Sequence, residues 1–238
     1  MRFIAIICAS LFANAAQADD LSATFVNPTT RYGHAALGEG HEWAAIKITA
    51  TSCAKCLLST HRSNTFALPN DAVFEDLSPR VVDLDQDGKS EILTVESSPT
   101  AGSRLFLIGI DGAIAAGDYI GQRHRWMAII GAADFDGDGT IEVAYIETPH
   151  LGKTLKIARL NGDHFDVIAH APSLTNHHYG AQIVESAILP CGGHALILTA
   201  NADWTQVMAT TFKDGKLTSV PFGPYAGAQS FQALPNCN

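Results

Sequence analysis

Basic side chains are scarce in this chain of 238 residues. Lysine and arginine together number 15 against 24 aspartates and glutamates, which gives a net charge of −9. A surface with this balance has no strong electrostatic attraction for nucleic acid or for an anionic membrane. We therefore expect neither as a partner. The hydrophobic content of 47% in turn excludes a disordered chain.

The chain also lacks a hydrophobic run of the roughly 20 residues that a membrane span needs. The apolar run at residues 3–12 follows Arg2 and precedes Ala16-Gln17-Ala18. A basic residue, a short apolar run and a small-x-small site are typical of a secretory signal peptide. We predict that residues 1–18 are removed, that residues 19–238 form a single domain, and that the mature protein is periplasmic or secreted.

Cysteine is rare as well, since only five are present and Cys8 falls inside the signal peptide. Four remain in the mature chain, and an even number in an oxidising compartment favours two disulfides. We expect Cys53 to join Cys56, and Cys191 to join Cys237. The Cys-x-x-Cys pair at positions 53 and 56 could instead be a redox pair or half of a zinc site, and the sequence leaves that alternative open.

Helical periodicity is absent after the signal peptide, whereas an internal repeat is present. Residues 82–92 recur as residues 133–143 with the same order of acidic, glycine and apolar positions. Around the second copy, alternating or apolar segments predict four strands. These segments are 127–133, 141–147, 155–160 and 165–169, with a hairpin turn at Asn161-Gly162-Asp163.

Weaker copies of the unit begin near residues 31, 73, 177 and 225, besides the copy that begins near 124. Two spare strands are expected near residues 21–28 and 226–232. A four-stranded unit repeated every 40 to 50 residues or so is typical of a propeller blade. We predict an all-β fold, a β-propeller of roughly four to five four-stranded blades.

Both strong copies contain the pattern Asp-x-Asp-x-Asp-Gly-x-x-Glu, between the first and second strands of a blade. Carboxylates at this spacing converge on one hard cation, and an oxygen-only loop suits calcium better than magnesium, zinc or copper. An EF-hand is excluded because the closing glutamate stands at position 9 rather than 12 and strands flank the loop. The predicted ligands are Asp83, Asp85, Asp87, the Lys89 carbonyl and Glu91, and Asp134, Asp136, Asp138, the Thr140 carbonyl and Glu142.

These two loops, each followed by an apolar strand, resemble the calcium loops of FG-GAP or VCBS-type repeats. The best-known fold of that family is the N-terminal β-propeller of integrin α subunits. The resemblance implies two Ca²⁺ sites at the residues just named. The Phe-Gly motif of the family is replaced here by Trp126-Met127-Ala128, which weakens any inference to an integrin-like partner, and glutamate closes each loop where many members carry aspartate.

Basic and aromatic residues collect where several units begin, on the face that the resemblance places opposite the calcium loops. We predict that they form a pocket for an anionic or sugar-like ligand. The alternative is a set of ordinary solvated loop residues. The residues concerned are Arg31, His34, Arg123, His124, Arg125, His177, His178 and Tyr179.

We therefore expect an exported, monomeric, calcium-binding propeller that acts as a non-catalytic binding or scaffold module. Its partner would be a protein, a carbohydrate or an anionic small ligand. The alternative is a periplasmic or extracellular hydrolase or lyase that uses the histidine and arginine cluster. No nucleophile elbow is present, and the carboxylates best placed for acid–base work are assigned to metal, which favours the non-enzyme.

Overall fold

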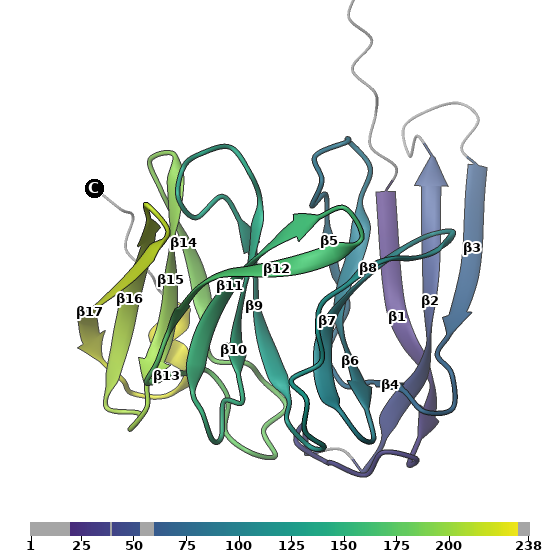
Figure 1. Cartoon of the computed structure of the whole chain (residues 1–238), viewed down its shortest axis with the longest axis horizontal. Helices are drawn as coiled ribbons and strands as arrows, with labels where there is room; N and C mark the ends of the chain where they lie inside the picture. Colours follow the sequence, from purple (N-terminus) through teal and green to yellow (C-terminus); the bar gives the residue numbers. More distant parts are fainter. Residues whose placement is uncertain (1–19, 39, 53–59, 233–238) are drawn as a thin grey trace, which may run out of the picture.

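The computed structural model describes residues 20–38, 40–52 and 60–232, and this part of the chain is all-β. Its strands form four antiparallel units that lie side by side in Figure 1, from the N-terminal unit on the right to the C-terminal unit on the left. Within these residues the helical structure is limited to the 3₁₀ helix η1 (Ala228–Phe231). No helix in the same residues is long and apolar enough to cross a membrane.

Each unit is a small sheet of strands that follow one another along the chain. Unit 1 contains β1 (Asp20–Thr29), β2 (Glu42–Ser52) and β3 (Thr60–Ala67). Unit 2 contains β5 (Arg80–Val82), β6 (Glu91–Ser98), β7 (Gly102–Gly109) and β8 (Gly112–Ala116), with β4 (Val73–Phe74) paired to the end of β6. Unit 3 contains β9 (Met127–Ala133), β10 (Glu142–Glu147), β11 (Thr154–Asn161) and β12 (His164–Ala171). Unit 4 contains β14 (Ala187–Cys191), β15 (His194–Asn201), β16 (Gln206–Lys213) and β17 (Lys216–Pro224), with β13 (Leu174–Thr175) paired to the end of β15.

The strands expected around the second acidic loop are confirmed. The four predicted segments correspond to β9, β10, β11 and β12, which pair in sequence order. The predicted turn at Asn161-Gly162-Asp163 joins β11 to β12, and Gly162 has a φ of 62°, a left-handed conformation that glycine adopts without strain. The alternation of apolar residues in these segments predicted the strands because each strand packs on a hydrophobic core.

One expected unit boundary and one expected strand are wrong. The segment near residue 31 lies inside unit 1, because β1 before it and β2 after it pair with each other. The Glu42 carboxylate curls this segment by accepting hydrogen bonds from the backbone N–H groups of Gly33 and His34. Residues 226–232 form no strand but contain η1, which follows a turn at Gly227 with a φ of 102°. The other spare strand, 21–28, is part of β1.

The hydrophobic core lies between the units rather than within any one of them. In β6, Ile92 packs into the cluster shared with unit 1, whereas Leu93 and Val95 pack into the cluster shared with unit 3. In β10, Tyr145 joins the cluster shared with unit 2, and Ile146 joins the one shared with unit 4. Successive residues of a strand point to opposite faces, so the central strands are apolar on both sides.

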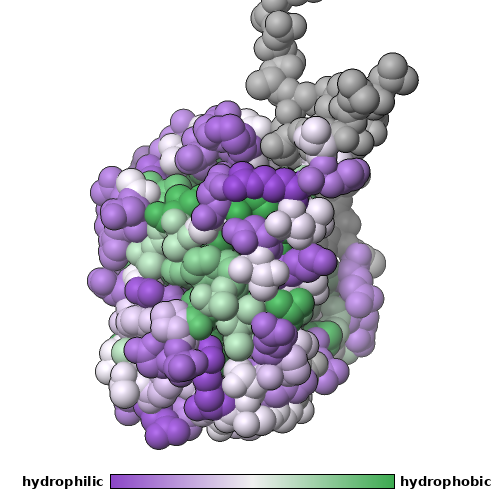
Figure 2. All heavy atoms as spheres, turned by 90° about the vertical axis from the view of Figure 1, so that its right-hand side faces the viewer, coloured by the Kyte–Doolittle hydropathy of each residue, from purple (hydrophilic) through white to green (hydrophobic). Residues whose placement is uncertain are grey.

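Neighbouring units are also joined at their edges. His164 of β12 pairs in parallel with Ala116 of β8, and Trp43 of β2 pairs with Phe74 of β4. Unit 1 stands at one end of the row and has a neighbouring sheet on one side. Figure 2 looks onto this end of the molecule and shows apolar atoms gathered in a central patch with a hydrophilic border.

Candidate metal loops and a histidine-lined pocket

The first acidic loop connects β5 to β6, and the second connects β9 to β10. Both therefore join the first and second strands of a four-stranded unit, as the sequence predicts. In the first loop, one ligand atom each of Asp83, Asp85 and Glu91 lies within 4.8 Å of the others. In the second, the same holds for Asp134, Asp136 and Glu142.

Backbone N–H groups hold the carboxylates of the first loop in place. Gly88 N donates to Asp83 Oδ2 at 3.1 Å, Asp87 N donates to Asp85 Oδ1 at 3.0 Å, and Leu84 N donates to Glu91 Oε2 at 3.0 Å. Gly88 supplies the left-handed turn, with a φ of 87°. The loop is thus ordered by its own backbone, and each carboxylate keeps a second oxygen for another partner.

One of these second oxygens is buried without a protein partner. Asp83 Oδ1 is buried and accepts no hydrogen bond, which is costly for a carboxylate unless a cation binds it. Burial, together with the neighbouring carboxylates of Asp85 and Asp83, raises the pKa of Glu91 to about 7. Three carboxylates that repel one another around an unpartnered oxygen fit a hard divalent cation.

The third aspartate of each loop takes another partner in the structure. Asp87 Oδ2 accepts from Lys89 Nζ at 3.0 Å, and Asp138 Oδ1 accepts from the backbone N–H of Thr140 at 2.8 Å. Neither belongs to the group of converging ligand atoms. Asp87 and Asp138 therefore stay predicted ligands, as do the carbonyls of Lys89 and Thr140.

The second loop differs from the first in containing a guanidinium group. Arg159 of β11 is paired with Glu142 in register, and its Nε donates to Glu142 Oε1 at 3.0 Å. Its Nη2 donates to Asp138 Oδ2 at 3.0 Å and to Asp136 Oδ2 at 3.5 Å. Asp134 has both oxygens occupied by backbone N–H groups, those of Gly137 and Gly139. The oxygen donors of the second loop suit a cation, but Arg159 already neutralises part of the negative charge of their carboxylates.

Several of the basic and aromatic residues that the sequence predicts to bind an anionic or sugar-like ligand lie together at the other end of β9. A cavity of about 280 Å³ lies just before Met127, whereas the second acidic loop begins just after Ala133. A strand of this length spans about 20 Å. We call this cavity the four-segment pocket, because its lining comes from the segments after β1, before β9, after β10 and after β13. Its lining residues are His34, His124, Arg125, Trp126, Thr148, Pro149, His150, Leu151 and Tyr179.

His34 is the most firmly held side chain of the four-segment pocket. Its Nδ1 lies 2.5 Å from the carboxylate of Glu75, which is almost fully buried and also accepts a hydrogen bond from Ser97 Oγ at 2.5 Å. The His34 ring stacks on His124 with 4.8 Å between centroids, and its carbonyl accepts from Tyr179 Oη at 2.8 Å. The unused Nε2 of His34 therefore has a fixed place in the wall of the pocket.

The other histidines of the pocket are held neutral. Burial, with the neighbouring His177 as a smaller cause, lowers the pKa of His150 to about 4. Burial also lowers the pKa of His124 and of His177. His150 Nε2 lies 2.9 Å from His177 Nδ1. Near neutral pH the positive charge of the pocket therefore comes from Arg125 rather than from these rings.

Not all of the basic and aromatic residues predicted to bind a small ligand line this pocket. Arg31 points away and donates through Nε to the carbonyl of Ala72 at 2.9 Å. Arg123 donates to His124 Nε2 at 3.1 Å. His178 stacks on Trp204 with 3.7 Å between centroids and lies outside the lining of the pocket. His34, His124, Arg125 and Tyr179 are brought together, and His177 supports the wall behind them.

Sequence reasoning missed His150, which lines this pocket, and Glu75, which lies behind His34 outside the lining. His150 follows β10 and precedes β11, so it lies in a connection within unit 3 and not at the start of a unit. Glu75 interrupts the basic pattern in the sequence, yet it is the carboxylate that orients His34. An acidic residue directly after the apolar stretch Ala72–Phe74 was the available signal for it.

Four antiparallel units, two of which have an acidic loop between their first and second strands, define a β-repeat protein with candidate metal loops. Residues 83–145 match the family model of the FG-GAP-like repeat, from the start of the first loop to the middle of β10. This segment, which contains both acidic loops, is thus similar to the FG-GAP-like repeat. A search of the curated proteins gives no significant match. The predicted signal peptide and Cys53, Cys56 and Cys237 lie outside the described residues.

Proposed function

We propose that the protein is an exported, calcium-binding FG-GAP module with a propeller-like arrangement of its units, and that it serves as a non-catalytic binding or scaffold protein. The observation that carries the calcium part is the buried, unpartnered Asp83 Oδ1 among the converging carboxylates of the first loop. Calcium suits the loops because all donors are oxygens and a turn of this kind adjusts to several ligands. When bound, the ion supplies charge neutralisation that fixes the start of β6 and of β10.

The binding part of the proposal rests on the four-segment pocket. Arg125 provides one fixed positive charge, the ring of His34 provides a hydrogen-bonding nitrogen, and Tyr179 is 63% exposed with its ring available for stacking. This combination matches an anionic or sugar-like ligand. Calcium would act at the far end of β9 and stabilise the unit without touching the ligand.

Thermal unfolding of the purified, metal-stripped protein tests the calcium proposal. A ligand that binds only the native state at 100 times its Kd adds about 2.7 kcal/mol, which raises the Tm of a domain of this size by roughly 5–10 °C. Asp85→Ala and Asp136→Ala should each remove the share of one loop, whereas Asp163→Asn, at an exposed turn, should leave the gain intact. An identical Tm with calcium and with chelator would overturn the proposal.

A second candidate is a hydrolase or lyase that uses the same pocket. The observation that favours it is the pairing of His34 Nδ1 with the buried Glu75 carboxylate, the arrangement that holds a general base in one tautomer. Turnover of an acidic polysaccharide that is lost in both Glu75→Gln and His34→Gln, with the Tm response to calcium unchanged, would support this candidate over the binding module.

A further inference from the structure

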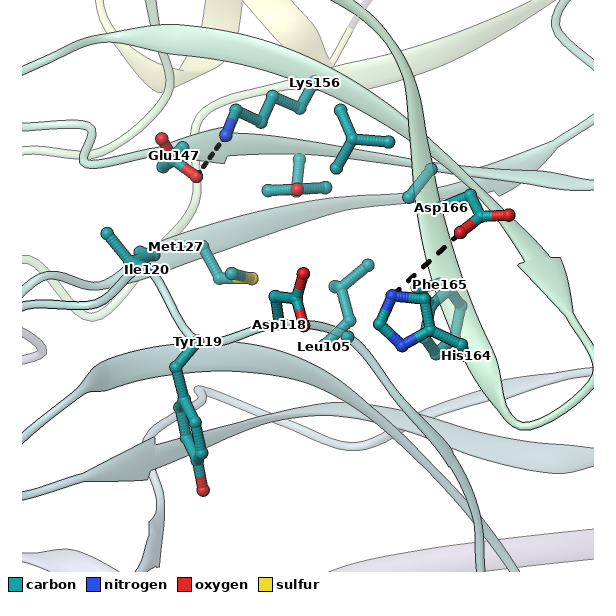
Figure 3. Close-up of a pocket in the computed structure, with 14 residues that line it drawn as sticks. Leu105, Asp118, Tyr119, Ile120, Met127, Glu147, Lys156, His164, Phe165 and Asp166 are labelled. Carbon is teal, nitrogen blue, oxygen red and sulfur yellow. Dashed lines mark hydrogen bonds and ion pairs between the residues drawn. The ribbon is translucent and has the colours of Figure 1, made fainter.

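A second cavity lies at the seam between units 2 and 3, and its lining shares no residue with the acidic loops or with the four-segment pocket. We call it the seam cavity; its volume is about 340 Å³, within the range of small-ligand sites. Figure 3 shows the charged side chains that line it: Glu147 with Lys156 on one side, His164 with Asp166 on the other, and Asp118 between them.

Both walls of the seam cavity are held by backbone hydrogen bonds. Gly117 N donates to Leu105 O, and Ile120 N donates to Ser103 O, each at 3.0 Å, so the segment with Asp118 runs along β7 as an extra edge. On the other wall, Ala116 N donates to Asp163 O at 3.1 Å, which anchors the β11–β12 hairpin to β8. The position of Asp118 relative to β12 is therefore built into the fold.

The charges of the seam cavity do not balance. Lys156 Nζ is taken by Glu147 Oε2 at 2.5 Å, and Asp166 Oδ1 lies 4.0 Å from His164 Nε2. Among the described residues, no hydrogen bond or ion pair engages the Asp118 carboxylate. Three carboxylates thus face one ammonium group, and the centre of the cavity has an excess of negative charge.

The floor of the seam cavity is apolar. Leu105, Met127 and Phe165 line it and are almost fully buried, as parts of the core between units 2 and 3. An anion is excluded by the charge. A metal ion is disfavoured, because in the described residues the sets of three converging ligand atoms occur only in the two acidic loops. A cation with an aliphatic stem matches both the charge and the floor.

We propose that the seam cavity binds an aliphatic primary amine, with the ammonium group at Asp118 and the stem over Leu105 and Met127. The ammonium group would donate hydrogen bonds to the two oxygens of the Asp118 carboxylate, and the stem would lose water against buried carbon. A free diamine and a lysine side chain of a bound peptide share this chemistry. The proposal does not depend on the function proposed above.

Calorimetric titration of the calcium-saturated protein tests this proposal. The probes are cadaverine, a diamine with a five-carbon stem, and Nα-acetyl-lysine amide; pentanediol, of the same stem length without charge, is the control ligand. We expect one binding event with an amine and none with pentanediol. Stronger binding of cadaverine indicates a free diamine, and stronger binding of the lysine derivative indicates a peptide side chain.

Two variants decide whether the binding takes place at the seam. Asp118→Asn keeps the shape and removes the charge, and it should weaken amine binding by about tenfold or more, the effect of about 1.4 kcal/mol. Asp163→Asn removes an exposed carboxylate from the same hairpin but from outside the cavity lining, and it should change affinity by less than about twofold. Absence of amine binding in the wild type, or equal binding by Asp118→Asn, would overturn the proposal.

Discussion

Arg159 and Glu142 are direct cross-strand partners, and their hydrogen bond places a guanidinium group among the carboxylates of the second acidic loop. The first loop has no such group in the equivalent place. There Ile92 pairs with Ile108, so the residue of β7 opposite Glu91 is Gly109. The two loops share a sequence pattern but differ in the charge that surrounds it, and a cation must displace Arg159 only from the second.

The second loop should therefore bind calcium more weakly than the first. In an Asp85→Asn background, which disables the first loop, Arg159→Gln should tighten calcium binding by about tenfold, or about 1.4 kcal/mol, because one competing positive charge is gone. The same change should lower the Tm in chelator, since the buried Glu142 then loses its cationic partner. Titration calorimetry and thermal unfolding measure the two effects.

Arg104→Gln is the matched control for this experiment. Arg104 of β7 is likewise the cross-strand partner of a glutamate, Glu96 of β6, and donates a hydrogen bond to its carboxylate. This pair lies far from either loop. Its loss should reduce stability without changing calcium affinity. If Arg159→Gln leaves the affinity as it was, Arg159 does not compete with the ion.

Close backbone contact between units 1 and 4 should make Gly38 irreplaceable. Gly180 N donates to Ala36 O at 2.9 Å, and a Cβ on Gly38 would lie 2.1 Å from Gly180 O. Gly38 also has a φ of 75°. Gly38→Ala should cost about 1–3 kcal/mol and weaken binding at the four-segment pocket. Gly40→Ala, where a Cβ meets nothing within 4 Å, should leave both the Tm and the binding unchanged.

The disulfide pairing remains a specific prediction. Cys191 is a buried residue at the end of β14, and we expect Cys237 to reach it and Cys53 to bond with Cys56. Peptide mapping without reduction should recover these two pairs. A peptide that links position 53 or 56 to either distant cysteine would contradict the pairing.

The sequence predicted best what depends on local pattern. The acidic loops, the strands β9 to β12 and the Gly162 turn follow from spacing within a few residues, and the structure has them where expected. Failure came where a local pattern was read as a unit boundary. Residues 31–34 look like the start of a repeat, but their course is set by the carboxylate of Glu42, several residues further along the chain.

The candidate sites were predictable only in part, because side-chain partners from other units cannot be read from spacing. Nothing near Glu142 in the sequence indicates that Arg159 enters the loop; the β10–β11 register does so. Likewise, Glu75 and His34 meet across 41 residues of chain. The seam cavity arises from the pairing of β8 with β12, a contact between units that no single repeat encodes.

The last prediction concerns the pH dependence of stability. Burial and neighbouring His177 lower the pKa of His150 from 6.5 to about 4 in the native state. Between these values the unfolded chain binds a proton that the native protein does not, so stability rises with pH across this window and is lost as the pH falls from about 6.5 towards 4. His34, His178 and Lys153 also face His150 and act in the same direction.

His150→Gln should therefore flatten the dependence of the free energy of unfolding on pH in this window, measured by urea denaturation in saturating calcium so that the acidic loops contribute equally in both proteins. His61→Gln, at an exposed position of β3, serves as the control and should keep the wild-type slope. Two results would contradict this prediction: a wild-type slope that is already zero between pH 4.5 and about 6, or a slope that His150→Gln leaves unchanged. Either would mean that His150 is protonated in the native protein. The four-segment pocket would then carry more positive charge than Arg125 alone provides.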